Sequence, residues 1–209
     1  MQNITLYTNP SSRGKIIRWM LEECGADYDV VPVPYGADGT KSADFLAINP
    51  MGKLPALKYG DTVITETLAI ITFLTELFPN KQLIPTQGTA ERAEFYRWLV
   101  FAVHFEYAVM DKWFNVPETP ERKRSIGYGS FDEAMTTLSE FLQDKQYAIG
   151  DHFTALDLYL SSLIGWAIMR TQVVSMDSEL ANFMKRHATR PAFIKTQQLD
   201  AELAKQMGL

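Results

Sequence analysis

The stretch from Asn49 to Thr67 constrains the fold more than any other part of the chain. It reads NPMGKLPALKYGDTVITET. Pro55 has no N–H group to give to a sheet ladder, so we expect it at the start of a strand rather than inside one. Gly60 and Asp61 lie between two short runs of strand-forming residues and suit a tight hairpin turn. The stretch therefore predicts an antiparallel strand pair that leads into a helix.

Two places in this stretch favour ligand binding. Leu54 precedes the proline, and an X-Pro bond can be cis at a cost of only about 0.5–1 kcal/mol, which would turn the backbone N–H and C=O of Leu54 outward. Glu66 and Thr67 open the next helix, where unpaired N–H groups and the positive end of the helix dipole attract a carboxylate. The sequence thus predicts a peptide-binding edge beside an anion site.

The pattern N-P-x-G-x-L-P-x-L, followed by a hairpin and then by E-T-x-A-I, resembles the glutathione-binding half of cytosolic glutathione transferases. In that family the residue before the proline pairs with the backbone of the cysteinyl unit of glutathione, and the proline is cis. An acidic residue and a hydroxyl residue bind the γ-glutamyl end of glutathione. The resemblance gives these roles to Leu54, Pro55, Glu66 and Thr67.

The first half of the chain predicts the element order β-α-β-α-β-β-α. A helix separates the first two strands, which calls for a parallel pair. This is the order of the thioredoxin-like N-terminal domain in the family that the chain resembles. The expected elements are strands over 4–7 and 28–33, a helix from about 13 that Gly25 ends, a short helix over 41–48, the hairpin, and a helix over 66–77.

Hydroxyl groups lie where the first strand runs into a helix, and such a site can stabilise a thiolate. The family uses Tyr, Ser or Cys in this region to activate the thiol of glutathione. Ser12 matches the string N-P-x-S-R of bacterial members, whereas spacing from the helix end matches Ser11 to the serine-type classes and Tyr7 to the tyrosine-type classes. We rank Ser12 first, Ser11 second and Tyr7 third, and Arg13 adds positive charge. Either serine also suits the helix N-cap.

Two lysines are further candidates for glutathione binding. Lys41 and Lys53 occupy regions where family members often place a basic or amide side chain, and either ammonium could meet the glycyl carboxylate. The alternative is a solvated surface lysine. The single cysteine, Cys24, is expected to be a small buried hydrophobic residue, and no Cys-x-x-Cys motif exists.

The second half is expected to be helical. We predict a first domain over 1–79, a linker over 80–88, and an all-helical domain over 89–209 that contributes the electrophile site. Residues 90–113 carry more aromatic side chains than one helix face can bury, which leaves surface for a cleft or for a second subunit. Thr154 and Asp157 predict a capping box within a string that resembles the family's C-terminal folding motif. The expected electrophile site comprises Phe101, His104, Phe105, Met110 and Trp113.

The composition excludes several partners. A net charge of −5 gives no electrostatic basis for binding nucleic acid or anionic membranes. No apolar run approaches a membrane span, the start lacks a signal peptide, and one cysteine fits a reducing compartment, so a cytoplasmic location is expected. The three histidines lack the spacing of metal ligands, and no metal is expected.

The resemblance implies a glutathione transferase, with glutathione as co-substrate and no metal. It would add the glutathione thiolate to small hydrophobic electrophiles in detoxification, with peroxide reduction as a side activity, and would form a homodimer. The alternative is a non-catalytic protein of the same fold that serves as a binding or regulatory module. The intact Glu66-Thr67 pair and the acidic charge balance favour the enzyme.

Overall fold

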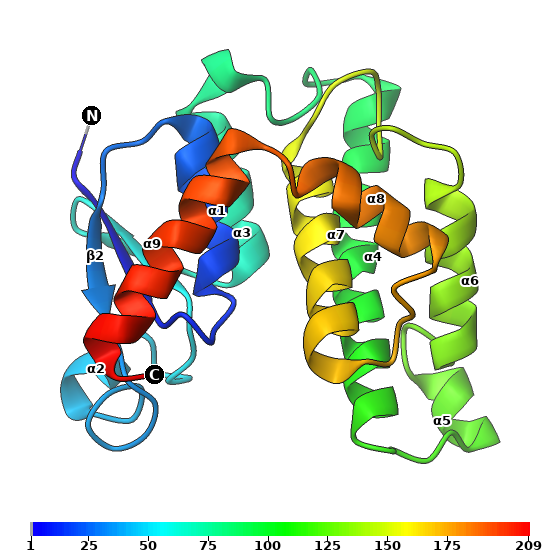
Figure 1. Ribbon diagram of the computed structural model, residues 1–209, viewed down its shortest axis with the longest axis horizontal. Coiled ribbons are helices and arrows are strands. Elements are labelled where there is room, and N and C mark those ends of the chain that lie inside the picture. Colours follow the sequence, from blue (N-terminus) through cyan, green and yellow to red (C-terminus); the bar gives the residue numbers. More distant parts are fainter. Residues whose placement is uncertain (1) are drawn as a thin grey trace. The chain divides into compact units, whose positions relative to one another are not determined.

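The computed structural model describes residues 2–209, which form two compact units (Figure 1). The first unit contains the residues up to Gln82 together with Arg190–Leu209, and the second contains Leu83–Thr189. The first has the expected thioredoxin-like arrangement of strands and helices, and the second is built of helices. In residues 2–209, no helix has the length and apolar character needed to cross a membrane.

A four-stranded mixed sheet forms the centre of the first unit. Its strands lie in the order β2-β1-β3-β4, with β1 parallel to β2 and antiparallel to β3, and with β3 antiparallel to β4. The expected hairpin is confirmed, because Tyr59 pairs with Thr62 across the two-residue turn Gly60-Asp61. The strands are β1 (Ile4–Thr8), β2 (Asp29–Pro32), β3 (Ala56–Tyr59) and β4 (Thr62–Thr65).

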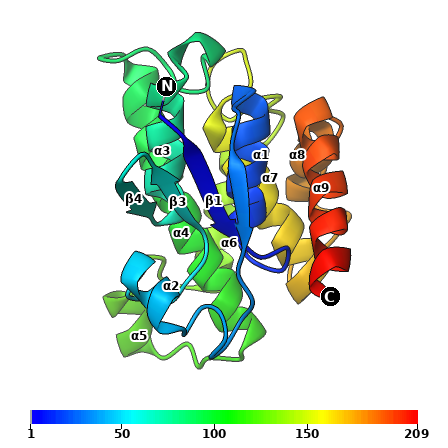
Figure 2. The same ribbon diagram turned by 90° about the vertical axis from the view of Figure 1, so that its left-hand side faces the viewer.

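Helices pack on both faces of this sheet. Ile4, Leu6 and Thr8 alternate with more exposed residues along β1 and are buried on the face that α1 and α3 cover (Figure 2). Tyr7 points to the other face, where its ring packs against Phe45 of α2. The helices are α1 (Gly14–Cys24), α2 (Ala43–Ile48), α3 (Thr67–Leu77), the 3₁₀ turn η1 (Pro79–Lys81) and α9 (Pro191–Met207).

The last helix belongs to the first unit, which differs from the expected domain division. Residues 89–209 are expected to form one helical domain, whereas α9 lies alongside α1 in the first unit (Figure 1). Trp19 of α1 and Phe193 of α9 make an edge-on ring contact of 4.8 Å, and Arg190 donates two hydrogen bonds to Glu23. These contacts over a long sequence separation place α9 with the first unit.

The second unit confirms the predicted capping box at its buried helix α7. The N–H and the hydroxyl of Thr154 both donate to Asp157, and the N–H of Ala148 donates to the other oxygen of the same carboxylate. Phe105 and Tyr159 are among the large side chains of the core. The helices are α4 (Ala90–Trp113), α5 (Pro120–Ser125), α6 (Phe131–Leu142), α7 (Ala155–Trp166), the π-helix η2 (Ala167–Thr171) and α8 (Glu179–His187).

Candidate functional site

The strand register brings the predicted binding segments to one end of the sheet. Thr8, the last residue of β1, pairs with Pro32 at the end of β2. Ala56, the first residue of β3, pairs with Tyr7 and with Thr65 at the end of β4. The loops after β1, β2 and β4 and the loop before β3 therefore meet at the same edge of the first unit.

The loop before β3 presents an unpaired backbone. The Leu54–Pro55 peptide bond is cis, as the resemblance implied. The N–H and C=O groups of Leu54 take part in no hydrogen bond within residues 2–209. Asn49, which the sequence analysis did not single out, is buried and supports this loop: it accepts from the N–H of Met51 at 3.1 Å and donates to the C=O of Lys53 at 2.9 Å.

Glu66 has an unusual backbone conformation at the start of α3. Its φ of 66° and ψ of 122° lie in a region that residues with a side chain rarely adopt. Such conformations cost about 1–3 kcal/mol and cluster at ligand-binding sites. Its side chain is exposed and does not cap α3, so the N–H groups of the first helical turn, which starts at Thr67, are left for another acceptor.

At the start of α1, the Ser12 hydroxyl is fully engaged within its own loop. It donates to the C=O of Asn9 at 2.7 Å and accepts from the N–H of Gly14 at 2.9 Å and from the N–H of Asn9 at 3.3 Å. A serine hydroxyl has one proton to donate and two lone pairs. Ser12 therefore accepts from the first N–H of α1 at Gly14, but the N-cap position expected for one of the two serines is occupied by Arg13.

Ser11 and Tyr7 differ from Ser12 in their surroundings. The side chain of Ser11 is exposed, and its hydroxyl makes no hydrogen bond within residues 2–209. Tyr7 lies in β1, with its ring centre 6.2 Å from that of Phe45 on the α2 side of the sheet. Arg13 is half-buried at the position before α1. Of the three candidate hydroxyl groups, that of Ser11 is the one on an exposed side chain beside the N-terminus of α1.

The two candidate lysines have different partners. The ammonium of Lys41 donates to the C=O of Met51 at 2.9 Å, and it lies beside Gly52, where a side chain would collide with it. Lys53 is exposed and directly precedes Leu54. Both lysines thus lie at the predicted peptide-binding edge, and Lys41 also stabilises the turn there.

The five residues expected at the electrophile site do not gather on one face of α4. Phe105 is completely buried, so its side chain cannot contact a ligand in this structure, and the expectation for it is not met. Phe101 packs on Trp98, whose ring stacks on Phe141 of α6. His104 packs against Gly127, where an added Cβ would lie 2.5 Å from its ring. The side chains of Phe101 and His104 are half-buried, so their place in an electrophile site stays a prediction.

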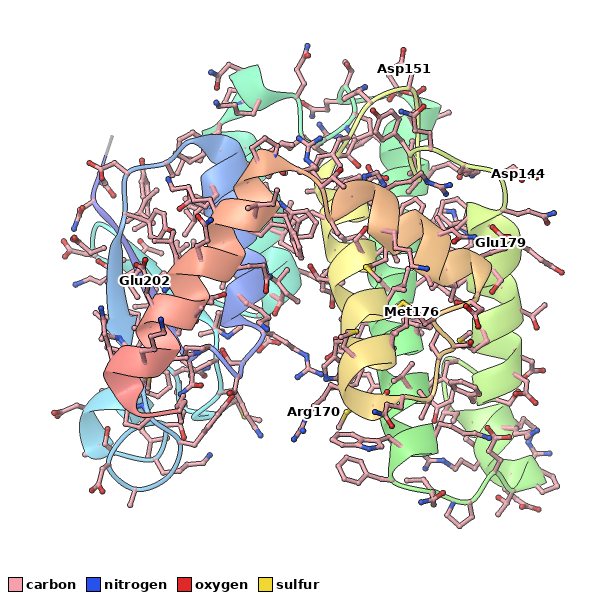
Figure 3. The ribbon with its side chains drawn as sticks, in the orientation of Figure 1. Asp144, Asp151, Arg170, Met176, Glu179 and Glu202 are labelled. Atoms are coloured by element: carbon pink, nitrogen blue, oxygen red, sulfur yellow. The ribbon has the colours of Figure 1, made fainter. Side chains whose placement is uncertain are left out.

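Trp113 lies at the other end of α4 and remains accessible. Its ring contacts that of Trp166 in α7 at 6.5 Å, and the guanidinium of Arg170 lies 5.8 Å from its ring centre (Figure 3). Met110, one turn earlier, is half-buried. The sequence pattern could not separate these two residues from Phe105, because aromatic and apolar residues surround the helix on all sides.

Within residues 2–209, no group of three or more His, Cys, Asp or Glu side chains has an arrangement that could hold a metal ion.

The family model for the N-terminal domain of glutathione S-transferases matches residues 10–77. This segment contains every predicted binding residue of the first unit except Tyr7. Over longer stretches, the chain is 30% identical to glutathione S-transferase Z1 of Arabidopsis thaliana, in an alignment of 191 residues that covers 88% of this chain and 86% of the relative. It is 28% identical to the glutathione S-transferase GstA of Escherichia coli O157:H7, over 89% of this chain and 93% of the relative.

A similar fold occurs in solved structures. The crystal structure of a glutathione transferase from Methylococcus capsulatus superimposes with a TM-score of 0.78 at 28% sequence identity, and the match covers 95% of this chain and 98% of that one. The likeness therefore extends over both units.

Proposed function

Because this chain belongs to the glutathione S-transferase family, we propose that it conjugates the thiolate of bound glutathione to small hydrophobic electrophiles. The observation that carries the proposal is the register of the sheet, which brings Leu54, Glu66 and the start of α1 to the same edge. A tripeptide with a thiol at its centre needs three such features: a backbone partner, an anchor for its charged end and a site for its sulfur.

The edge offers a partner for each part of glutathione. The backbone of Leu54 pairs with the cysteinyl unit. The carboxylate of Glu66 meets the γ-glutamyl ammonium, while the hydroxyl of Thr67 and the N–H groups at the start of α3 meet its carboxylate. Lys41 and Lys53 face the glycyl carboxylate at the other end.

Thiol activation takes place at the start of α1. Lowering the pKa of the bound thiol by about two units requires about 2.7 kcal/mol of differential stabilisation, which one or two hydrogen bonds to the charged sulfur supply. We place Ser11 ahead of Ser12 and Tyr7 as the donor, because its hydroxyl is exposed and is not used within the loop. Arg13 adds positive charge near the sulfur.

In the conjugation step, the glutathione sulfur forms a bond to the electrophilic carbon, and the leaving group departs with the electron pair of the broken bond. The second unit contributes the electrophile site, with Trp113 and Met110 as its accessible residues on α4. Reduction of peroxides by the same thiolate is a side activity. A cytoplasmic location stays a prediction.

The alternative is a protein of this fold that binds glutathione or a partner without catalysis. The two proposed functions differ in their effect on the glutathione thiol. A transferase lowers the pKa of the bound thiol, whereas a non-catalytic binding module is expected to leave it unchanged.

The test is the ultraviolet absorbance of the glutathione thiolate, titrated with pH in the presence of wild type, Ser11→Ala, Ser12→Ala and Tyr7→Phe. We expect the wild type to lower the thiol pKa by one unit or more, and Ser11→Ala to lose most of this effect while it still binds glutathione. A thiol pKa that is unshifted in the wild type would exclude transferase chemistry and favour the binding module.

We also propose that the protein is a homodimer in which α4 supplies part of the contact. Tyr96, Val100 and Tyr107 recur along one side of α4, and Phe114 directly follows the helix; their exposed fractions lie between 42% and 63%. Sedimentation of the wild type and of Val100→Glu tests this. We expect a dimer for the wild type and a monomer for the variant, and a monomeric wild type would refute the proposal.

A further inference from the structure

Asn9, which lies just before α1, forms hydrogen bonds with both candidate serines. It is 1% exposed. Its side-chain Oδ1 accepts from the N–H of Ser11 at 2.9 Å, and its backbone C=O accepts from both the hydroxyl and the N–H of Ser12. The backbone C=O of Asn9 therefore takes the proton of Ser12, while its side chain sets the direction of the backbone at Ser11.

Asn9 also connects this loop to a second one. Its Nδ2 donates to the C=O of Val33 at 3.0 Å, next to the backbone hydrogen bond from the N–H of Val33 to the C=O of Thr8. The second loop is held by its own hydrogen bond from the N–H of Thr40 to the C=O of Pro34.

Tyr35 lies in this second loop, close to the start of α1. Its side chain is 58% exposed. Partial burial raises the pKa of Tyr35, whereas the charge of Arg13 and the Ser12 hydroxyl lower it, so its phenol lies near both residues. The amide of Asn9 thus ties together two loops that converge on the start of α1.

We infer that the side chain of Asn9 is a positioning group for thiol activation, which holds the Ser11 hydroxyl toward the glutathione sulfur by fixing the N–H of Ser11 and anchoring the loop to Val33. The inference rests on the proposed function, because it concerns the same thiol. Asn9 does not touch the sulfur. It acts through Ser11, since its Oδ1 holds the N–H of that residue and no other side chain in the described part of the chain does so.

The test measures the bound thiol pKa in Asn9→Ala, in Ser11→Ala and in the double variant. Because a hydrogen bond to a charged group is worth about one pKa unit or more, we expect Asn9→Ala to raise the thiol pKa by about one unit. The double variant should show no further rise over Ser11→Ala, because both changes remove the same interaction. Affinity for S-methylglutathione, which has no ionisable thiol, should change by less than about threefold, since none of its binding contacts is removed.

Asn49→Ala is the matched control. Asn49 is also buried and also bridges a loop through one accepted and one donated hydrogen bond, but it supports the loop before Leu54. We expect Asn49→Ala to weaken binding of glutathione and S-methylglutathione alike and to leave the thiol pKa unchanged. Asn9→Ser provides a second variant in case Asn9→Ala does not fold, because a serine hydroxyl can accept from the N–H of Ser11 in the same kind of turn without adding a charge. We expect its bound thiol pKa to rise by less than in Ser11→Ala.

The outcomes separate the two proposals. A wild type that lowers the thiol pKa, with Asn9→Ala and Asn9→Ser that lower it equally, would overturn the positioning role and leave the transferase function standing. Additive rises in the double variant would show that Asn9 does not act through Ser11 and would also overturn it. A wild type that binds glutathione without lowering its thiol pKa would overturn both.

Discussion

The guanidinium of Arg18 in α1 lies 3.3 Å from the carboxylate of Asp200 in α9, and both side chains are almost completely buried. Where α9 begins, Arg190 donates two hydrogen bonds to the carboxylate of Glu23 near the end of α1, at 2.6 Å and 2.7 Å. Each contact joins a residue near the start of the chain to one near its end. Complementary charges therefore specify how the last helix docks on the first.

Removing one partner of the Arg18–Asp200 pair should destabilise the protein strongly. We expect Arg18→Met or Asp200→Leu alone to lower the free energy of unfolding by about 3–5 kcal/mol, because each leaves a buried charge without its partner. The double variant should recover most of this loss, since two apolar side chains can replace a buried ion pair at little cost. Urea denaturation of the four proteins measures the coupling.

Lys195→Gln is the control for this cycle. Lys195 pairs with Glu22 across the same two helices, but its side chain is 62% exposed, so its removal should cost less than about 1 kcal/mol. A double variant whose loss equals the sum of the two single losses would show that Arg18 and Asp200 are not coupled.

Local rules were enough to predict how the segments of the candidate site are arranged in the first unit. Pro55 cannot donate to a ladder, Gly60-Asp61 forms a two-residue turn and Glu66 precedes a helix, so the sequence predicts the order of elements and the edge at which they meet. The hydrogen bonds of the Ser12 hydroxyl to its own loop could not be predicted from the sequence in the same way. Two adjacent serines satisfy the same cap rule, and only the positions of Asn9 and Gly14 decide between them.

Tertiary contacts decided the features that the sequence analysis did not predict. The position of α9 in the first unit depends on Arg18, whose buried charge on α1 is paired with Asp200 of α9. Asn9 had one available signal, the Asn-Pro-x-Ser string, which is typical of a turn held by an asparagine side chain. Phe105 and Trp113 have the same aromatic character, and only the packing of α4 shows which of them is buried.

The stability of the second unit should depend on the charge of Asp157. Burial raises the pKa of Asp157 to about 6, although N–H groups of Ala148 and Thr154 and the Thr154 hydroxyl lower it. The folded state therefore binds more protons than the unfolded state between about pH 4 and pH 6, and the unfolding free energy should fall as pH rises through this window. A shift of this size corresponds to about 3 kcal/mol.

Asp157→Asn should lack this fall, so the stability difference between wild type and variant should shift toward the variant as pH rises from about 4 to 6. Urea denaturation at a series of pH values measures it. Asp151→Asn is the control, because the Asp151 side chain is fully exposed in the same segment. Identical slopes for wild type and Asp157→Asn would show that the buried carboxyl does not titrate in this range.

Cys24 should be inert in the folded protein. Burial raises the pKa of the Cys24 thiol to about 12, while the charge of Lys81 opposes the rise. At pH 8 its thiolate fraction is then about a thousandfold smaller than that of an exposed cysteine, whose pKa is about 8.5. We expect iodoacetamide to modify Cys24 at least about 100-fold faster in urea than in the native protein. Equal rates would show that the Cys24 thiol is accessible and reactive in the native protein.

Glu66 should lower the stability of the fold and raise the affinity for glutathione. Its positive φ costs about 1–3 kcal/mol in a residue with a side chain, and glycine adopts this conformation readily. Glu66→Gly should therefore leave the unfolding free energy unchanged or raise it by about 1 kcal/mol, because relief of strain exceeds the entropy that glycine loses on folding. Its affinity for glutathione should fall about 10- to 100-fold, since the carboxylate that meets the γ-glutamyl ammonium is gone.

Glu66→Gln separates the two effects. It keeps the strained backbone and removes only the charge, so its stability should match that of the wild type while its affinity falls as in Glu66→Gly. Isothermal titration with glutathione and thermal unfolding without it measure the two quantities on the same samples. If Glu66→Gly bound glutathione as tightly as the wild type, the carboxylate would have no part in binding, and the positive φ of Glu66 would need a structural explanation instead.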